Sequence, residues 1–201
     1  MGLIAYLVNI PLTLIKEGGY PLIFILIAME SSYIPIPSEI ILPFSGYLVY
    51  IGIFNFWLVF LVSVAGTVAG ATAGYVIAYQ FGEDRTATIL KYFLITKKDL
   101  NKAKIFFNKY GSATIFISRM LPAVRTYIAF PAGIYDMDIK KYFIYTATGT
   151  VPWCLFLIYV GIIFGPHWNY IDSSPVHYLL YLFAIIFVLF ILYKVTVNQR
   201  G

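Results

Sequence analysis

Two arginines, Arg119 and Arg125, flank Pro122 inside a long apolar run, 113–135. An arginine at bilayer depth costs about 2.5–3.5 kcal/mol on insertion scales, so it is retained only where a partner or water meets its charge. Proline also interrupts helical hydrogen bonding, so this run does not have the pattern of a plain transmembrane helix. The run instead predicts a chain reversal in which both guanidinium groups meet an anion or a carboxylate.

The composition of the chain indicates a bilayer as its solvent. Of its 201 residues, 61% are hydrophobic and 11% are charged, whereas soluble domains carry about 25% charged residues. The length suits a single membrane domain over residues 1–201 with several membrane segments. The net charge of +5 arises largely from one segment between apolar runs, which favours membrane orientation over nucleic-acid binding. Cys154 is the only cysteine, and no regular spacing of ligands predicts a metal site or a cofactor.

The stretch 20–53 is apolar but is broken in its middle by acids and prolines. Its two carboxylates are Glu30 and Glu39. Each apolar arm has about ten residues, too few to cross a hydrocarbon core about 30 Å thick. Backbone freed by proline is tolerated at this depth only inside protein or beside a wet cavity. The pattern predicts a re-entrant hairpin that turns and returns to its own side of the membrane. The residues expected to shape it are Pro35, Pro37, Pro43 and Gly46.

A second broken run, 112–135, carries the two arginines and has charged residues near both ends. We expect a second re-entrant hairpin here, shaped by Pro122 and Gly133. Uninterrupted apolar runs at 54–81 and 142–164 predict full transmembrane helices. The domain therefore divides into two halves, each a hairpin followed by a span, at 20–82 and 111–165.

The lysine-rich middle of the chain, 83–110, sets the expected orientation. By the positive-inside rule this linker is cytoplasmic, and an apolar stripe toward its end predicts a helix lying on the membrane surface. A C-terminal span at 176–194 would bring Lys194 and Arg200 to the cytoplasmic side as well. Residues 1–15 are too few to cross and predict an interfacial or partly inserted helix. The expected location is the cell membrane, with multiple passes.

The two halves share a short repeat at the same internal separation. The matched residues are Gly66-Thr67-Val68 with Gly82, and Gly149-Thr150-Val151 with Gly165. Because a hairpin returns to its own side and a span crosses, the second half would start from the opposite face, as in many transporters. The expected fold class is an all-α integral membrane protein with two opposed re-entrant helical hairpins in inverted repeats, about three full transmembrane helices and interfacial amphipathic helices. The glycine-rich face around Gly70 predicts close helix packing, either within one chain or in a homo-oligomer.

Both charged segments resemble motifs of a known family. The pattern Glu30…Pro35-Ile-Pro37-Ser-Glu39…Pro43…Gly46 resembles the first motif of the DedA family, also called the SNARE-associated Golgi or VTT-domain family. The pattern Arg119-x-x-Pro122-x-x-Arg125…Ala132-Gly133…Met137…Phe143…Gly149…Trp153 resembles its second. The resemblance covers roughly 20–165. It implies movement of lipids between leaflets, with a polyprenyl phosphate or a phospholipid as substrate and dependence on the proton gradient. By motif match, the functional acids would be Glu30 and Glu39 and the essential arginines Arg119 and Arg125. Glu39 follows a short spacer, where many bacterial members have a longer one ending in Asp, so the coupling ion, proton or sodium, stays open.

Arginine chemistry agrees with such a substrate. A guanidinium group binds phosphate through a planar fork of donors, so Arg119 and Arg125 could hold one lipid headgroup. Alternatively, each arginine could pair with a glutamate and lock the hairpins together. Desolvation favours a neutral glutamate and a nearby arginine favours a charged one, so Glu30 or Glu39 could change protonation during a transport cycle.

Two other functions use the same residues. A proton-coupled small-ion antiporter would use Glu30 and Glu39 without a lipid. A membrane lipid phosphatase would use the arginines, but it needs a nucleophile and a base, and His167 and His177 lie outside both hairpins. A non-enzymatic lipid translocase is therefore the expected function.

Overall fold

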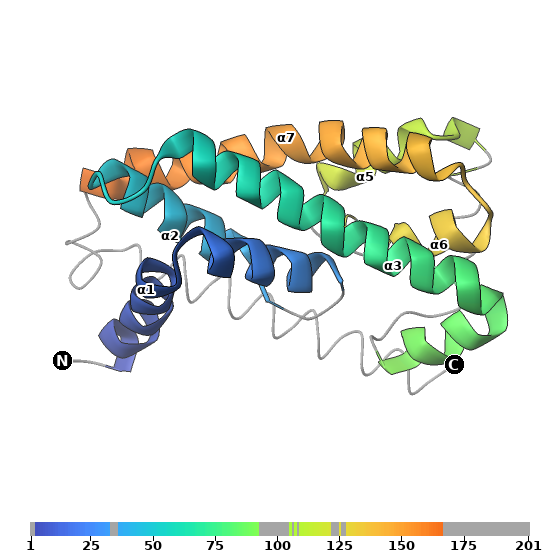
Figure 1. Cartoon of the computed structure of the whole chain (residues 1–201), viewed down its shortest axis with the longest axis horizontal. Coiled ribbons are helices and arrows are strands. Elements are labelled where there is room, and N and C mark those ends of the chain that lie inside the picture. The colour runs from blue at the N-terminus through green and yellow to red at the C-terminus, as the bar shows by residue number, and fades with distance from the viewer. Residues whose placement is uncertain are drawn as a thin grey trace.

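The computed structural model of the chain describes residues 3–32, 36–92, 105, 107, 109–121, 125 and 128–166. The regular elements within these ranges are helical, which confirms the all-α class. They are α1 (Leu3–Ser31), α2 (Ser38–Tyr50), α3 (Phe56–Tyr92), α5 (Ala113–Arg119), α6 (Ala129–Ile134) and α7 (Ile139–Phe164) (Figure 1).

Among the described residues, two helices are long and apolar enough to cross a membrane, and they correspond to the two spans expected within the halves. They are Phe56–Gly82 of α3 and Ile139–Phe164 of α7, the latter with 26 residues. At a rise of 1.5 Å per residue such a helix extends about 39 Å, more than the hydrocarbon core. Large apolar side chains lie on their outer faces, where Trp57 is 65% and Ile163 is 66% exposed, as expected for surfaces that lipid covers. The span expected at 176–194 lies outside the described residues.

Two glycines change the direction of the helices that contain them. Gly19 has φ 60° and Gly82 has φ 66°, a region that residues with a side chain rarely adopt. α1 bends at Gly19 and α3 bends at Gly82 (Figure 1). The first bend lies between the N-terminal segment 1–15 and the stretch 20–53, in which the sequence predicts the first hairpin. The second lies where the apolar run ends, but α3 continues to Tyr92, into the stretch expected to be a linker.

Each half contains a pair of helices before its long helix. In the first half, α1 runs to the middle of the molecule and α2 runs back along it (Figure 1). Pro37 precedes α2 in an extended conformation, and Pro43 lies inside that helix. In the second half, α5 and α6 are shorter, with 7 and 6 residues. Pro35 and Pro122, both expected to shape the turns, lie outside the described residues.

The first helix of each pair packs against the long helix of its own half. A Cβ atom added at Gly66 of α3 would lie 2.7 Å from the carbonyl oxygen of Phe24 in α1. A Cβ atom added at Gly149 of α7 would lie 2.9 Å from the carbonyl oxygen of Phe116 in α5. These two glycines are matched in the sequence repeat, and each allows the backbones of its two helices to approach closely.

The second helix of each pair packs against the long helix of the other half. A Cβ atom at Gly46 of α2 would lie 2.2 Å from the carbonyl oxygen of Ile158 and 3.1 Å from the Cα atom of Gly161, both in α7. A Cβ atom at Gly133 of α6 would lie 2.4 Å from the carbonyl oxygen of Tyr75 in α3. The two halves are therefore in contact at Gly46 and Gly133. Both glycines were predicted from the sequence to shape the hairpins.

The apolar side chains form two clusters with a polar layer between them. Along α3, Val59 belongs to one cluster and Ala71 to the other. Along α7, Cys154 belongs to the first cluster and Tyr142 to the second. Polar side chains fill the interval on both helices, and this interval holds the site described next.

Candidate functional site

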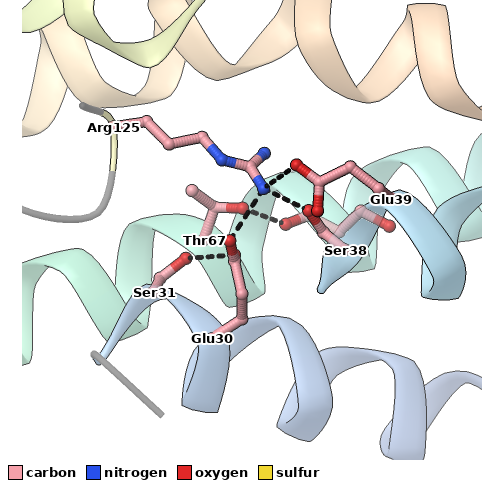
Figure 2. A network of polar contacts seen from close by, with 7 residues as sticks. Glu30, Ser31, Ser38, Glu39, Thr67 and Arg125 are labelled. Atoms are coloured by element: carbon pink, nitrogen blue, oxygen red, sulfur yellow. Dashed lines mark hydrogen bonds and ion pairs between the residues drawn. The ribbon is translucent and has the colours of Figure 1, made fainter. Parts of the chain in front are cut away.

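Arg125 lies at the centre of a polar network that joins three parts of the chain. Its Nη2 atom donates to Glu30 Oε1 at 2.8 Å and to Glu39 Oε1 at 3.0 Å. The same atom donates to the Ser38 hydroxyl. Figure 2 shows the guanidinium group reaching from the connection between α5 and α6 toward carboxylates at the end of α1 and the start of α2. The contacts connect the two hairpins predicted from the sequence.

The two ion pairs differ in their exposure. The side chains of Arg125 and Glu30 are 10% and 11% exposed, whereas that of Glu39 is 33% exposed. A buried pair is costly to break from one side, because the remaining charge is left without a partner in a low dielectric. Glu30 is therefore the stronger determinant of the position of Arg125, and Glu39 is the acid that solvent reaches more easily.

An aromatic ring and a hydroxyl group complete the surroundings of this pair. The Cζ atom of Arg125 lies 4.9 Å from the ring centroid of Trp153, within the range of a cation–π contact. Ser31 donates through its hydroxyl to Glu30 Oε2 at 3.4 Å. Arg125 is thus held by two ion pairs, by a hydrogen bond to Ser38 and by a cation–π contact with Trp153.

Arg119 has a different environment, although it borders the same space. The residue is 2% exposed, and its Nη2 atom donates to the hydroxyl oxygen of Tyr142 at 3.0 Å. Its Nε atom has no hydrogen-bond partner, and Arg119 forms no ion pair within the described part of the chain. A buried guanidinium group without a carboxylate is a group that an anion would stabilise.

A small cavity lies between the two arginines. Its lining includes Glu30, Arg119, Arg125, Thr150 and Trp153, and its volume is about 10 Å³, close to the space that one water molecule requires. Four buried polar atoms on its lining residues have no hydrogen-bond partner within the described ranges: Arg119 Nε, Arg125 Nε, Thr150 Oγ1 and Trp153 Nε1. Three of them can only donate, so the cavity has a surplus of donors.

The four charged residues expected from the sequence all line or border this site. Arg125 contacts both Glu30 and Glu39, which matches the ion-pair alternative. Arg119 does not follow that alternative, because its described partner is a neutral hydroxyl group.

Sequence reasoning missed the part of the site that α7 contributes. Tyr142, Thr150 and Trp153 were not among the candidate site residues, yet Tyr142 holds Arg119 and the other two line the cavity. A signal was present, because these residues recur with roughly helical spacing in an otherwise apolar span. Such a stripe indicates a face that packs against protein and not lipid.

Comparison with known proteins identifies the family. The model of the VTT domain matches residues 36–163. The chain is 32% identical to undecaprenyl phosphate transporter A of Bacillus subtilis over 81% of its own length and 80% of that protein. It is 30% identical to an alkaline phosphatase-like protein of Lactococcus lactis, covering 92% and 88% of the two chains, and 26% identical to the protein DedA of Escherichia coli, covering 76% and 73%. No solved structure matches the chain. The match over most of the described residues, together with the two motifs, shows that this chain belongs to the VTT-domain or DedA family of membrane proteins.

Proposed function

We propose that this chain is a membrane transporter that moves a phosphate-bearing lipid, a polyprenyl phosphate or a phospholipid, from one leaflet to the other. The observation that carries the proposal is the buried pair of guanidinium groups of Arg119 and Arg125 beside one cavity, of which Arg119 has no described carboxylate partner. A lipid phosphate offers acceptor oxygens to the donors of this cavity that have no hydrogen-bond partner among the described residues. Relatives named undecaprenyl phosphate transporter A, from Bacillus subtilis and Staphylococcus aureus, support a lipid phosphate as the substrate.

The proposal includes two opposed re-entrant hairpins arranged as inverted repeats. The matched packing of Gly66 and Gly149 against the first arm of each hairpin supports this arrangement. Residues with positive φ also precede each first arm, at Gly19 and Gly111, and a further pair, Gly52 and Asp136, follows each second arm. Hairpins entering from opposite leaflets would meet at the midplane, where transporters of this plan bind their substrates.

In this conformation the site is closed to a lipid headgroup. A cavity of about 10 Å³ accommodates one water molecule, and a phosphate group is several times larger. The guanidinium group of Arg125 lines this cavity and is bound to Glu30 and Glu39, so it is not free to bind a phosphate. Binding would therefore require Arg125 to exchange at least one carboxylate for the phosphate, which separates the hairpins locally and opens the site.

Charge balance supports coupling of this exchange to protons. Two arginines face two glutamates, so the site is neutral when all four are ionised. Adding a phosphate anion would leave uncompensated negative charge in a low dielectric, which is costly. Protonation of one glutamate restores neutrality and weakens its hold on Arg125. Glu39 is the more exposed acid and is therefore the proposed proton acceptor.

A lipid phosphatase is the rival class, since some relatives are named alkaline phosphatase-like proteins. Such an enzyme needs an activated nucleophile. Ser38 is the hydroxyl nearest to Arg125, but it accepts a hydrogen bond from that residue, and no histidine is present among the described residues to act as its base. The geometry therefore favours binding and movement of the phosphate over its hydrolysis.

Purified protein reconstituted in vesicles tests the proposal. Polyprenyl phosphate or phospholipid probes would be placed in one leaflet, and their appearance in the other would be measured for the wild type, Arg119→Gln, Arg125→Gln and Lys140→Gln. Lys140 is an exposed basic residue outside the cavity and serves as a matched control for lost charge. We expect both arginine variants to lose movement and Lys140→Gln to retain it.

The same vesicles separate the alternatives. Release of inorganic phosphate from the lipid would identify a phosphatase, and ion flux in vesicles without a phosphate-bearing lipid substrate would identify an antiporter. Lipid movement that is unchanged in both arginine variants would overturn the proposed function.

A further inference from the structure

The hydroxyl group of Tyr142 takes part in two hydrogen bonds that together fix its orientation. Its hydroxyl donates to the carbonyl oxygen of Ala71 in α3 at 3.0 Å. Because a carbonyl oxygen can only accept, the single phenolic proton is committed to Ala71 and the oxygen lone pairs are left for Arg119. Arg119 Nη2 donates to this oxygen at 3.0 Å. One side chain of α7 therefore connects α3 with the arginine that ends α5.

The ring of Tyr142 is held in place independently of these hydrogen bonds. The residue is fully buried, and its ring stacks on that of Tyr75 with centroids 4.8 Å apart and an interplanar angle of 26°. Tyr75 is itself anchored, because its hydroxyl donates to the carbonyl oxygen of Met137. The hydroxyl that Arg119 contacts is thus presented by a rigid aromatic pair.

The important property of this partner is that it is neutral. A carboxylate at the same position would orient Arg119 and also neutralise it, as Glu30 and Glu39 do for Arg125. Tyr142 orients the guanidinium group without forming an ion pair with it, so no carboxylate has to leave Arg119 before an anion binds there. The unpartnered Nε atom of Arg119 and the unpartnered Nε1 atom of Trp153, both on lining residues of the cavity, indicate where an anion would be received.

We propose that Tyr142 is the positioning residue that holds Arg119 as the first receptor for the phosphate, while Arg125 contacts the phosphate only after leaving its carboxylates. This inference rests on the proposed function of the site and adds an order of contacts to it. Arg119 attracts the anion as the site begins to open, and the arriving negative charge then competes with Glu30 and Glu39 for Arg125.

Two matched variants, Tyr142→Phe and Tyr75→Phe, test the positioning role. Each removes one hydroxyl from the same stacked pair together with one hydrogen bond to a backbone carbonyl, but only Tyr142→Phe removes the contact with Arg119. Lipid movement in vesicles would be measured over a range of lipid phosphate concentrations, and thermal unfolding would be measured in detergent. We expect Tyr142→Phe to raise the half-saturating concentration about tenfold, the effect of losing a hydrogen bond to a charged group.

Tyr75→Phe should leave the half-saturating concentration of lipid phosphate within about twofold of the wild type. It should lower thermal stability about as much as Tyr142→Phe does, since each variant loses a neutral hydrogen bond. Equal half-saturating concentrations for the two variants would overturn the inference. Thermal unfolding of Tyr142→Phe, Arg119→Gln and the double variant should show that the two losses of stability are not additive, because the hydroxyl and the guanidinium group contact each other. Fully additive losses would also overturn the inference.

Binding of inorganic phosphate to the purified protein in detergent tests the order of contacts without any tyrosine variant. Arg119→Gln should weaken phosphate binding more than Arg125→Gln does, because Arg125 is initially bound to carboxylates. The opposite ranking would contradict the order. The results distinguish the two claims. The proposed function fails if Arg119→Gln transports lipid normally. The inference alone fails if Arg119→Gln is inactive and the two tyrosine variants transport alike.

Discussion

Arg125 donates to Glu30 at 2.8 Å across 95 residues of sequence, and this contact joins the end of α1 to the connection between α5 and α6. Neither charge is stable alone in such a buried position, so the pair is a structural connection, and under the proposed function it is also the contact that a lipid phosphate must displace. Changes at the Glu30 pair should therefore act mainly on the stability of the fold, and changes at Glu39 mainly on the pH dependence of transport.

Replacing Arg125 with leucine should destabilise the protein by about 3–5 kcal/mol, because it leaves Glu30 buried without its partner. The double variant Arg125→Leu/Glu30→Gln should recover part of this loss. Glu39→Gln should cost about 1 kcal/mol or less, because its side chain is one-third exposed and its ion pair is partly screened. Denaturant unfolding in detergent measures all three. A double variant less stable than Arg125→Leu would contradict the assignment of the pair.

The crossing of α2 and α7 depends on the absence of side chains at two facing glycines. A Cβ atom at Gly161 would lie 2.1 Å from the carbonyl oxygen of Pro43, so the backbones would have to separate. Gly161→Ala should cost about 1–3 kcal/mol, the usual range for overpacking. Ile163→Ala on the exposed side of α7 is the matched control and should change stability by less than about 0.5 kcal/mol. Thermal and denaturant unfolding distinguish the two, and equal effects would show that the crossing is looser than described.

The proposed role of Glu39 predicts a change in the pH dependence of transport. Glu39→Gln mimics the protonated acid, so lipid movement should lose its dependence on external pH and on an imposed proton gradient while lipid binding is retained. Vesicle assays at several pH values on each side would measure this. Unchanged pH dependence in Glu39→Gln, with that of Glu30→Gln abolished, would transfer the role to Glu30.

The start of α7 should show a pH dependence of its own. Asp138 accepts a hydrogen bond from the backbone nitrogen of Lys141 at 2.9 Å, and this contact holds the pKa of Asp138 below its usual value. A lowered folded-state pKa stabilises the fold above the unfolded-state pKa of about 3.9, and this contribution is lost as the pH falls through the folded-state value.

Asp138→Ala should therefore lower the unfolding temperature at pH 6, because the helix loses its N-cap, and the difference from the wild type should shrink below about pH 4. Scanning fluorimetry between pH 3 and pH 6 provides the measurement. A difference that stays constant over this range would mean that the carboxylate charge does not contribute.

The amino-acid sequence was enough to predict an all-α fold in a membrane and to single out the charged residues that the structure brings together. An apolar composition and two unbroken runs predicted long apolar helices, and the described residues include two that are long and apolar enough to cross a membrane, Phe56–Gly82 of α3 and α7. Acids and arginines in proline-broken runs indicated buried charges that need partners, and Glu30 and Arg125 are such partners. These features are local, because hydrophobic length, proline and charge act within a few turns of the chain.

The pairing of these charges could not be predicted, because it depends on how the helices pack. Arg125 takes both carboxylates and Arg119 takes a tyrosine, although the two arginines look equivalent in the sequence. The outcome depends on Gly46 and Gly133, where the second arm of each hairpin packs against the long helix of the other half. The periodicity of the sequence does not predict such a crossing, because the crossing joins segments far apart in the chain. The partner of a buried charge is then the oppositely charged or polar group that helix packing brings within hydrogen-bonding distance.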